Sequence, residues 1–159
     1  MIRIAIDGPG GAGKSTIAKL VGDKLGLEYI DTGAMYRAVG LKLNRKGIKP
    51  DDLISISNVL EETTIDFVNG KIILDGDDVS DIIRTQEISK LASIYSQIPE
   101  VRSKLVDIQR KIAAGKSVIM DGRDIGTNVL TDAELKIFLT ADSMVRARRR
   151  YEELRSKGV

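Results

Sequence analysis

A glycine-rich segment near the amino terminus, Gly8–Ser15, has the residue types needed to hold phosphate. Its sequence, Gly-Pro-Gly-Gly-Ala-Gly-Lys-Ser, matches the pattern G-x-x-x-x-G-K-S/T. Glycines allow successive backbone amides to turn toward phosphate oxygens, and the helix that follows adds a favourable field. We expect Lys14 to reach the β- and γ-phosphates of ATP and the Ser15 hydroxyl to bind Mg²⁺. The expected ATP-binding residues are Gly8, Pro9, Gly10, Gly11, Ala12, Gly13, Lys14, Ser15 and Thr16.

Two other interpretations of these glycines are open. One is a purely structural turn. The other is a dinucleotide-binding loop, because Gly8, Gly10 and Gly13 also fit G-x-G-x-x-G and Asp31 follows the second predicted strand. Lys14 and Ser15 favour the phosphate loop, because a dinucleotide-binding loop does not require a cation and a hydroxyl in the first helical turn.

A second polar segment, Asp31–Arg37, follows that strand and begins a helix. Its hydroxyl and glycine, Thr32 and Gly33, stand at the helix start, and Arg37 follows one turn later. This arrangement suits a second anion near the first. The alternative is a capped helix with a solvated arginine.

A third polar segment, Asp121–Thr127, follows another apolar strand. Its side chains therefore emerge at the carboxyl end of a strand, where open α/β sheets bind ligands. We expect Arg123 to hold a phosphate and Asp124 to accept a hydrogen bond from an exocyclic amine. An ion pair between these two residues is the alternative.

Apolar runs and helical periodicities alternate along the chain, which predicts an α/β fold of the P-loop type with a parallel sheet and helices on both faces. The predicted strands are 2–6, 27–30, 117–120 and 135–139. The predicted helices are 14–25, 33–45, 50–62, 88–95, 99–115 and a last one capped by Asp142 or Ser143.

The period changes to two between residues 63 and 75. Apolar residues alternate on either side of Asn69-Gly70, which predicts an antiparallel hairpin with a type I′ turn, inserted at about 63–83. We expect one domain over residues 1–159, with a core of 1–31 and 115–159 and an acceptor-binding region of 32–114. A lid is expected to begin at about 145, where Arg146, Arg149 and Arg150 share a helical face; a solvated basic helix is the alternative.

The composition narrows the function classes. The chain has 159 residues, of which 42% are hydrophobic and 30% charged, and it has no cysteine and no histidine. The missing histidine excludes histidine-based triads and histidine-bound zinc, whereas phosphoryl transfer works by positioning and by Lys, Arg and Mg²⁺. The net charge of +2 is too small to indicate nucleic acid binding. No apolar run is long enough for a membrane span. The absence of cysteine fits a reducing compartment, so we expect a cytoplasmic protein.

Several segments together closely resemble bacterial cytidylate kinase, a nucleoside monophosphate kinase. They occur in the same order as in that family and extend over nearly the whole chain; 84–87 and 122–127 are the most specific. The segments are Gly8–Ser15, Asp31–Arg37, Ile83–Glu87, Ile98–Arg102 and Asp121–Thr127.

The resemblance implies phosphoryl transfer from ATP with Mg²⁺ to CMP or dCMP, by a monomeric enzyme. It implies catalytic roles for Lys14, Arg37 and Arg123. The two arginines would hold the acceptor phosphate. The residues implied in acceptor binding are Thr32, Tyr36, Arg37, Ser93, Arg102, Arg123 and Asp124, of which Ser93, Arg102 and Asp124 would read cytosine. Thr32 stands where the family usually has serine, and the hydroxyl is kept.

Members of this family continue past the basic helix into a last strand, which the resemblance implies is missing here. We therefore expect 135–139 to be an edge strand, and a chain that self-associates and has little activity. Two other functions are open: a nucleotide-binding fragment without catalysis, or a P-loop kinase of another small acceptor, such as another monophosphate, shikimate or dephospho-coenzyme A. The absence of an N-K-x-D motif argues against a GTPase.

Overall fold

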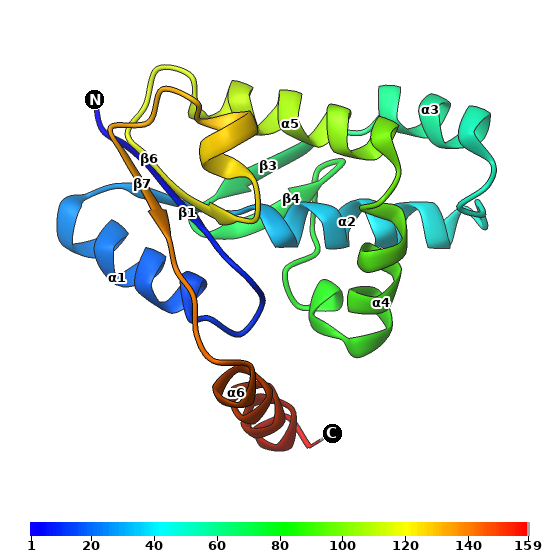
Figure 1. Ribbon diagram of the computed structural model, residues 1–159. Coiled ribbons are helices and arrows are strands. Elements are labelled where there is room, and N and C mark those ends of the chain that lie inside the picture. Colours follow the sequence, from blue (N-terminus) through cyan, green and yellow to red (C-terminus); the bar gives the residue numbers. More distant parts are fainter. Residues whose placement is uncertain (159) are drawn as a thin grey trace. The chain divides into compact units, whose positions relative to one another are not determined.

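The computed structural model describes residues 1–158 as alternating strands and helices (Figure 1). The chain forms two compact units. Unit 1 consists of residues 1–29 and 115–159, and unit 2 of residues 30–114. Among residues 1–158, no helix is both long and apolar enough to cross a membrane.

A four-stranded sheet has the order β2-β6-β1-β7. Its strands are β1 (Arg3–Asp7), β2 (Glu28–Asp31), β6 (Val118–Gly122) and β7 (Leu135–Phe138). β1 runs parallel to both β6 and β7, with Ile4 opposite Ile119 on one side and Leu135 on the other. The predicted parallel sheet is confirmed, and so is the edge position of β7 within the described sheet.

Helix α1 (Lys14–Leu25) packs against this sheet in unit 1 (Figure 1). Its Ala18 and Val21 contact the buried Ile6 and Ile119 of the strands. Burying a side chain of isoleucine size stabilises a fold by about 1.5–3 kcal/mol. Gly26, at φ 67°, ends the helix and donates its amide to Gly22, as the sequence predicts.

Two further elements complete unit 1. A π-helical turn, η2 (Ile125–Val129), follows β6 and was not predicted from the sequence. Such turns are rare and often lie at functional sites. Helix α6 (Ser143–Ser156) begins as predicted after Asp142, whose carboxylate accepts the amide of Met144 at 2.8 Å.

Unit 2 is mainly helical. It contains α2 (Thr32–Arg45), α3 (Leu53–Glu61), η1 (Ile82–Arg84), α4 (Gln86–Tyr95) and α5 (Pro99–Ala113). Helix α3 begins three residues later than predicted because the carboxylate of Asp52 accepts the amide of Ser55 and so fixes the helix start. Gly40 of α2 allows α4 to approach closely, since a Cβ there would lie 3.2 Å from the backbone nitrogen of Ala92.

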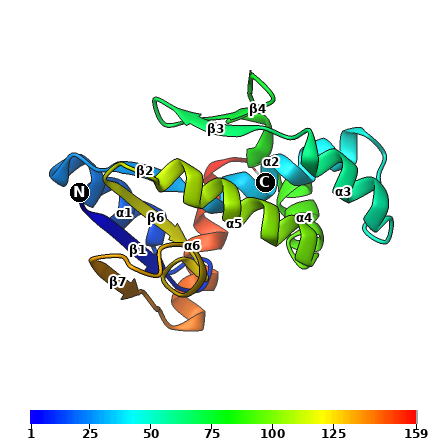
Figure 2. The same ribbon diagram turned by 90° about the horizontal axis from the view of Figure 1, so that it is seen from above.

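The predicted hairpin is present beside α2 (Figure 2). It is formed by β3 (Ile65–Val68) and β4 (Lys71–Leu74), and a short β5 (Asp77–Asp78) pairs with β4. Asn69 and Gly70 have φ angles of 51° and 76°, the two positive values that a type I′ turn requires. An ion pair of 2.5 Å between Lys42 of α2 and Asp75 ties the hairpin to the helix.

Candidate functional site

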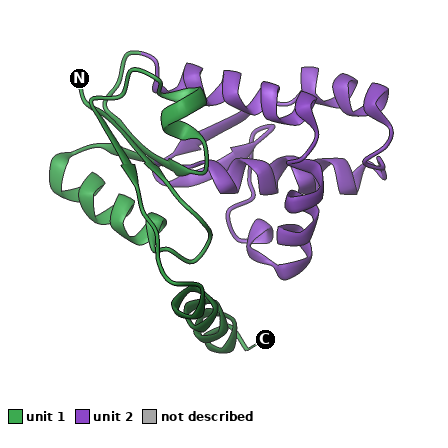
Figure 3. Cartoon of the chain, in the orientation of Figure 1, with its two compact units in different colours: residues 1–29, 115–159 green, residues 30–114 purple. Residues whose placement is uncertain are grey.

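The glycine-rich loop joins β1 to α1 in unit 1 (green in Figure 3). Gly8, Gly11 and Gly13 have φ angles of 149°, 77° and 95°, which other residues rarely adopt. A Cβ at Gly8 would lie only 1.9 Å from the carbonyl oxygen of Leu139. The loop conformation therefore depends on glycine at these positions, as phosphate-cradling loops do.

The start of α1 is suited to an anion. Its N-cap, Gly13, provides no side-chain cap among the described residues, so the amides of the first turn are not bonded by the capping residue's side chain. Lys14 donates its ammonium to the carbonyl oxygen of Pro9 at 3.0 Å, which holds the cation against the loop. Ser15 and Thr16 are exposed at the same helix end.

The guanidinium of Arg123 lies next to the loop. Its Nη2 is 3.8 Å from the position that a Cβ on Gly10 would take. Within residues 1–158 Arg123 has no ion-pair partner, so the alternative of a pair with Asp124 is not what the structure shows. A cation without a carboxylate beside a phosphate loop is suited to bind a phosphate.

The Asp124 carboxylate is oriented by the turn that follows it. Its Oδ2 accepts a hydrogen bond from Nδ2 of Asn128 at 3.0 Å, and its backbone carbonyl accepts the Asn128 amide at 2.9 Å. Thr127 donates its hydroxyl to the same carbonyl at 3.3 Å. Sequence reasoning missed Asn128, although its spacing of four residues from the aspartate is a detectable signal.

Two arginines of α6 lie against the loop. Arg149 donates to the carbonyl oxygen of Gly11 at 3.2 Å, and the backbone of Arg146 lies 3.2 Å from the position of a Cβ on that glycine. Arg150 shares this helical face, as predicted, because α6 is continuous from Ser143 to Ser156. Its guanidinium pairs with Glu153, three residues further along the helix, at 3.0 Å.

Arg37 of unit 2 has an unsatisfied buried donor. Its Nη2 pairs with Asp31 at 3.5 Å, and the Asp31 carboxylate also accepts the amide of Ala34, which caps α2. The Nε of Arg37 is buried and has no hydrogen-bond partner among the residues that the structure describes. A buried donor without a partner costs free energy, and a phosphate oxygen would satisfy it.

The other expected acceptor residues lie on three helices of unit 2. Thr32 and Tyr36 are on α2, Thr32 being buried, and Arg102 is in the first turn of α5. Ser93 is exposed on α4 and donates its hydroxyl to the carbonyl of Ser89 at 3.1 Å. Their roles in binding stay predictions.

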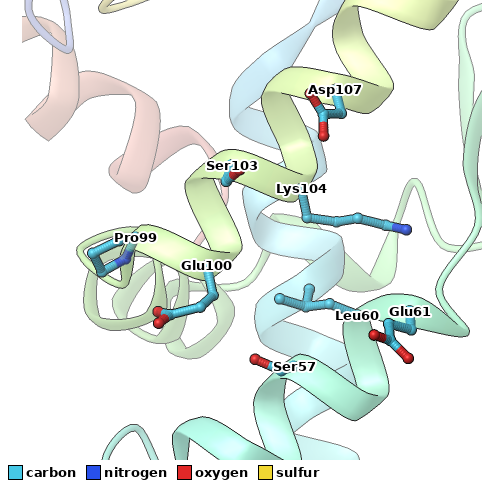
Figure 4. Close-up of a pocket in the computed structure, with 8 residues that line it drawn as sticks. All are labelled: Ser57, Leu60, Glu61, Pro99, Glu100, Ser103, Lys104 and Asp107. Atoms are coloured by element: carbon cyan, nitrogen blue, oxygen red, sulfur yellow. The ribbon is translucent and has the colours of Figure 1, made fainter.

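A depression of about 460 Å³ lies between α3 and α5 (Figure 4). Its lining includes Leu60, Pro99 and the charged side chains of Glu61 and Lys104. None of the residues expected to bind a ligand lines it. Within unit 1, the phosphate loop and Arg123, rather than a depression of this kind, therefore define the candidate site.

Sequence reasoning assigned no individual role to two carboxylates at the ends of adjacent strands, although one of them, Asp121, begins the third polar segment. Asp7 ends β1 and is buried; it accepts the amides of Ile125 and Gly126 at 2.7 and 2.8 Å. Asp121 of β6 is also buried and lies opposite Ile6 of β1. Within the described part of the chain, no three acidic, histidine or cysteine side chains gather as a metal cluster. For Asp7 and Asp121, the signal in the sequence was an acidic residue at the end of an apolar strand, where a buried carboxylate needs hydrogen-bond partners.

Comparisons with known proteins point to one family. Residues 4–159 match the family described as cytidylate kinase. A cytidylate kinase of Caldanaerobacter subterraneus subsp. tengcongensis is 57% identical over 157 residues, which cover 99% of this chain and 70% of that protein. A cytidylate kinase of Caldicellulosiruptor saccharolyticus is 57% identical over 161 residues (99% and 71%). One of Clostridium perfringens is 50% identical over 159 residues (100% and 73%).

Proposed function

This chain belongs to the cytidylate kinase family, and on that basis we propose that it transfers the γ-phosphoryl group of ATP to CMP or dCMP. One observation in the structure carries this proposal: the phosphate loop, with Lys14 bonded to it and Arg123 beside it. In the reaction, an oxygen of the CMP phosphate attacks the γ-phosphorus. The bond from that phosphorus to the bridging oxygen breaks, and its electron pair leaves with ADP, so that CDP forms.

The residue chemistry suits this reaction. The attacking phosphate oxygen is already ionised, so no general base is needed, and a chain without histidine can perform the step. The loop amides and Lys14 stabilise negative charge on the β- and γ-phosphates. Arg37 and Arg123 hold the acceptor phosphate, and the orphan Nε of Arg37 supports that role.

Recognition of the base falls to a carboxylate and two polar side chains. Asp124 accepts a hydrogen bond from the N4 amine of cytosine, whereas the carbonyl of uracil at that position would repel it. The hydrogen bond from Asn128 fixes the orientation of this carboxylate. Ser93 and Arg102 contact the remaining polar edge of the base, and Thr32 and Tyr36 line the acceptor position.

Magnesium fits the donors that the chain offers. Mg²⁺ prefers oxygen ligands and keeps several waters, so the Ser15 hydroxyl and phosphate oxygens are sufficient direct ligands. When bound, the ion neutralises charge that develops on the β- and γ-phosphates. We expect a lid to begin near Arg146, and the contacts of Arg146 and Arg149 with Gly11 support this expectation.

A panel of acceptors tests the proposal. Release of ADP from ATP is measured with CMP, dCMP, UMP, AMP and shikimate, in the presence of Mg²⁺. We expect kcat/KM with CMP and dCMP to exceed that with UMP by at least about 10-fold, because leaving one polar group unpaired costs about 1–3 kcal/mol. Equal turnover with every acceptor, or with none, would refute the assignment.

A further inference from the structure

The Asp7 carboxylate joins two segments that are far apart in the sequence. It is 9% exposed and lies at the end of β1, immediately before the phosphate loop. Its Oδ1 accepts the amide of Ile125 at 2.7 Å, and its Oδ2 accepts the amide of Gly126 at 2.8 Å, across sequence separations of 118 and 119 residues. Both oxygens are therefore used by the first two residues of η2.

The backbone of the same residue strengthens the junction. The carbonyl of Asp7 accepts the amide of Leu139 at 2.7 Å, and the amide of Gly8 donates to Gly122 at 3.2 Å. The start of the phosphate loop, the segment after β6 and the end of β7 thus meet at one residue. Among residues 1–158, the hydrogen bonds of this carboxylate go to η2, so its loss should loosen the start of η2 while the backbone bonds of the loop remain.

We propose that Asp7 is a positioning residue for Arg123 and Asp124. These two residues stand directly before η2, and the amides that Asp7 holds are the first two after Asp124. Asp7 therefore fixes where the acceptor-binding side chains stand relative to the phosphate loop, without touching the substrate. This inference rests on the proposed function, because it assigns the consequence to acceptor binding.

The junction needs two acceptor oxygens at position 7 and leaves little space for a side chain at Gly126. An asparagine at position 7 has one acceptor oxygen, so its NH₂ group would face one of the two amide donors. A Cβ at Gly126 would lie 3.3 Å from Oδ2 of Asp7 and 3.2 Å from the side chain of Lys136. Substitution on either side of the junction should therefore displace η2.

The test compares Asp7→Asn with Thr63→Val. Thr63 is buried in unit 2, and its hydroxyl donates to the carbonyl of Val59 at 2.6 Å, so this control also removes a buried hydrogen bond. The measurements are KM for CMP, UMP and ATP, the CMP to UMP ratio of kcat/KM, the melting temperature, and hydrogen exchange of the Ile125 and Gly126 amides.

For Asp7→Asn we expect kcat/KM with CMP to fall by at least about 10-fold, because small misplacement of binding groups has large effects. The CMP to UMP ratio should fall with it, KM for ATP should change much less, and the amides of Ile125 and Gly126 should exchange faster. Thr63→Val should lower the melting temperature and leave the ratio and those two amides unchanged.

The outcomes distinguish failure of the proposed function from failure of the positioning role of Asp7. A wild-type protein that does not prefer CMP refutes the proposed function itself. If the wild type prefers CMP and Asp7→Asn keeps its KM for CMP, its ratio and its amide protection, the positioning role is wrong. If Asp7→Asn does not fold, Gly126→Ala carries the test, since it disturbs the same junction and keeps the charge. A wild-type ratio in Gly126→Ala, together with protected amides, also overturns the proposal.

Discussion

The ammonium of Lys14 donates a hydrogen bond to the carbonyl oxygen of Pro9, 3.0 Å away and five residues earlier in the chain. The phosphate loop thus holds its own cation against its backbone. Binding of a triphosphate at the loop would replace this neutral acceptor with negatively charged oxygens, which attract the ammonium more strongly. Lys14 is therefore placed to act on the nucleotide with little rearrangement.

Replacement of this lysine tests its role. Lys14→Ala should fold normally but lose at least about 10²-fold in kcat, the scale for removing one preorganised charge donor. Lys24→Ala, in the exposed last turn of the same helix, is the matched control and should keep full turnover. Steady-state kinetics with ATP and CMP provide the measurement. Wild-type kcat and ATP affinity in Lys14→Ala would end the assignment of this loop.

The base-reading role of Asp124 is tested by Asp124→Asn. An amide can donate as well as accept, so the free-energy difference between CMP and UMP should narrow by about 1–3 kcal/mol. Asp132→Asn, at an exposed aspartate paired with Arg3, removes a carboxylate elsewhere in unit 1 and should leave the preference unchanged. The readout is kcat/KM for both acceptors. An unmoved ratio in Asp124→Asn would show that another group reads the base.

Alanine substitutions at Gly8 and Gly26, which both have positive φ, distinguish the cost of backbone strain from the cost of a steric clash. Gly8→Ala places a Cβ 1.9 Å from the carbonyl oxygen of Leu139, whereas a Cβ at Gly26 meets nothing within 4 Å. Gly26→Ala should therefore cost only the left-handed conformation, about 1–2 kcal/mol. Gly8→Ala should cost clearly more and should also weaken ATP binding. Thermal unfolding and ATP titration check both; equal stability of the two variants would contradict the loop geometry.

Local chemistry made several parts of this structure predictable. The phosphate loop follows from eight consecutive residues, and the hairpin follows from Asn69-Gly70, because that pair accepts the two positive φ angles that the turn needs. The cap of α6 at Asp142 and the end of α1 at Gly26 are likewise set by single residues, the first by its carboxylate and the second by its left-handed backbone. Each of these predictions needed only residues close together in the chain.

The parts that could not be predicted depend on contacts between distant residues. The bonds from Asp7 to the start of η2 join residues 118 and 119 positions apart, and no local pattern indicates them. The contact of Arg149 with Gly11 spans 138 positions. The π-helical turn at 125–129 is stabilised by the two hydrogen bonds to Asp7, and helical periodicity in the sequence does not indicate such bonds.

Acid should weaken the attachment of the hairpin to α2. Burial works to raise the pKa of Asp75, but hydrogen bonds from the Lys42 side chain and the Thr64 amide outweigh it, so the pKa lies below its usual value. A folded-state pKa below the unfolded one adds stability above about pH 4, and that stability is lost as pH falls through the folded pKa.

Melting temperatures from pH 7 down to about pH 2.5 measure this effect, since that range covers an ordinary carboxyl pKa near 4. Asp75→Asn should be less stable than the wild type at neutral pH and should lose less stability on acidification. Asparagine tolerates the positive φ of 50° at this position, so the backbone is preserved. Asp51→Asn, in an exposed loop, should follow the wild-type curve. Parallel curves for Asp75→Asn and the wild type would contradict the role of the ion pair.

The central claim is that this chain moves a phosphoryl group from ATP to CMP, and the destination of that group tests it most directly. The purified chain is mixed with ATP labelled in its γ-phosphate, Mg²⁺ and CMP, and the labelled products are separated over a single turnover. The account predicts label in CDP, much less label in UDP when UMP replaces CMP, and loss of transfer in Lys14→Ala. Label that appears only in inorganic phosphate, or equally in CDP and UDP, would contradict it.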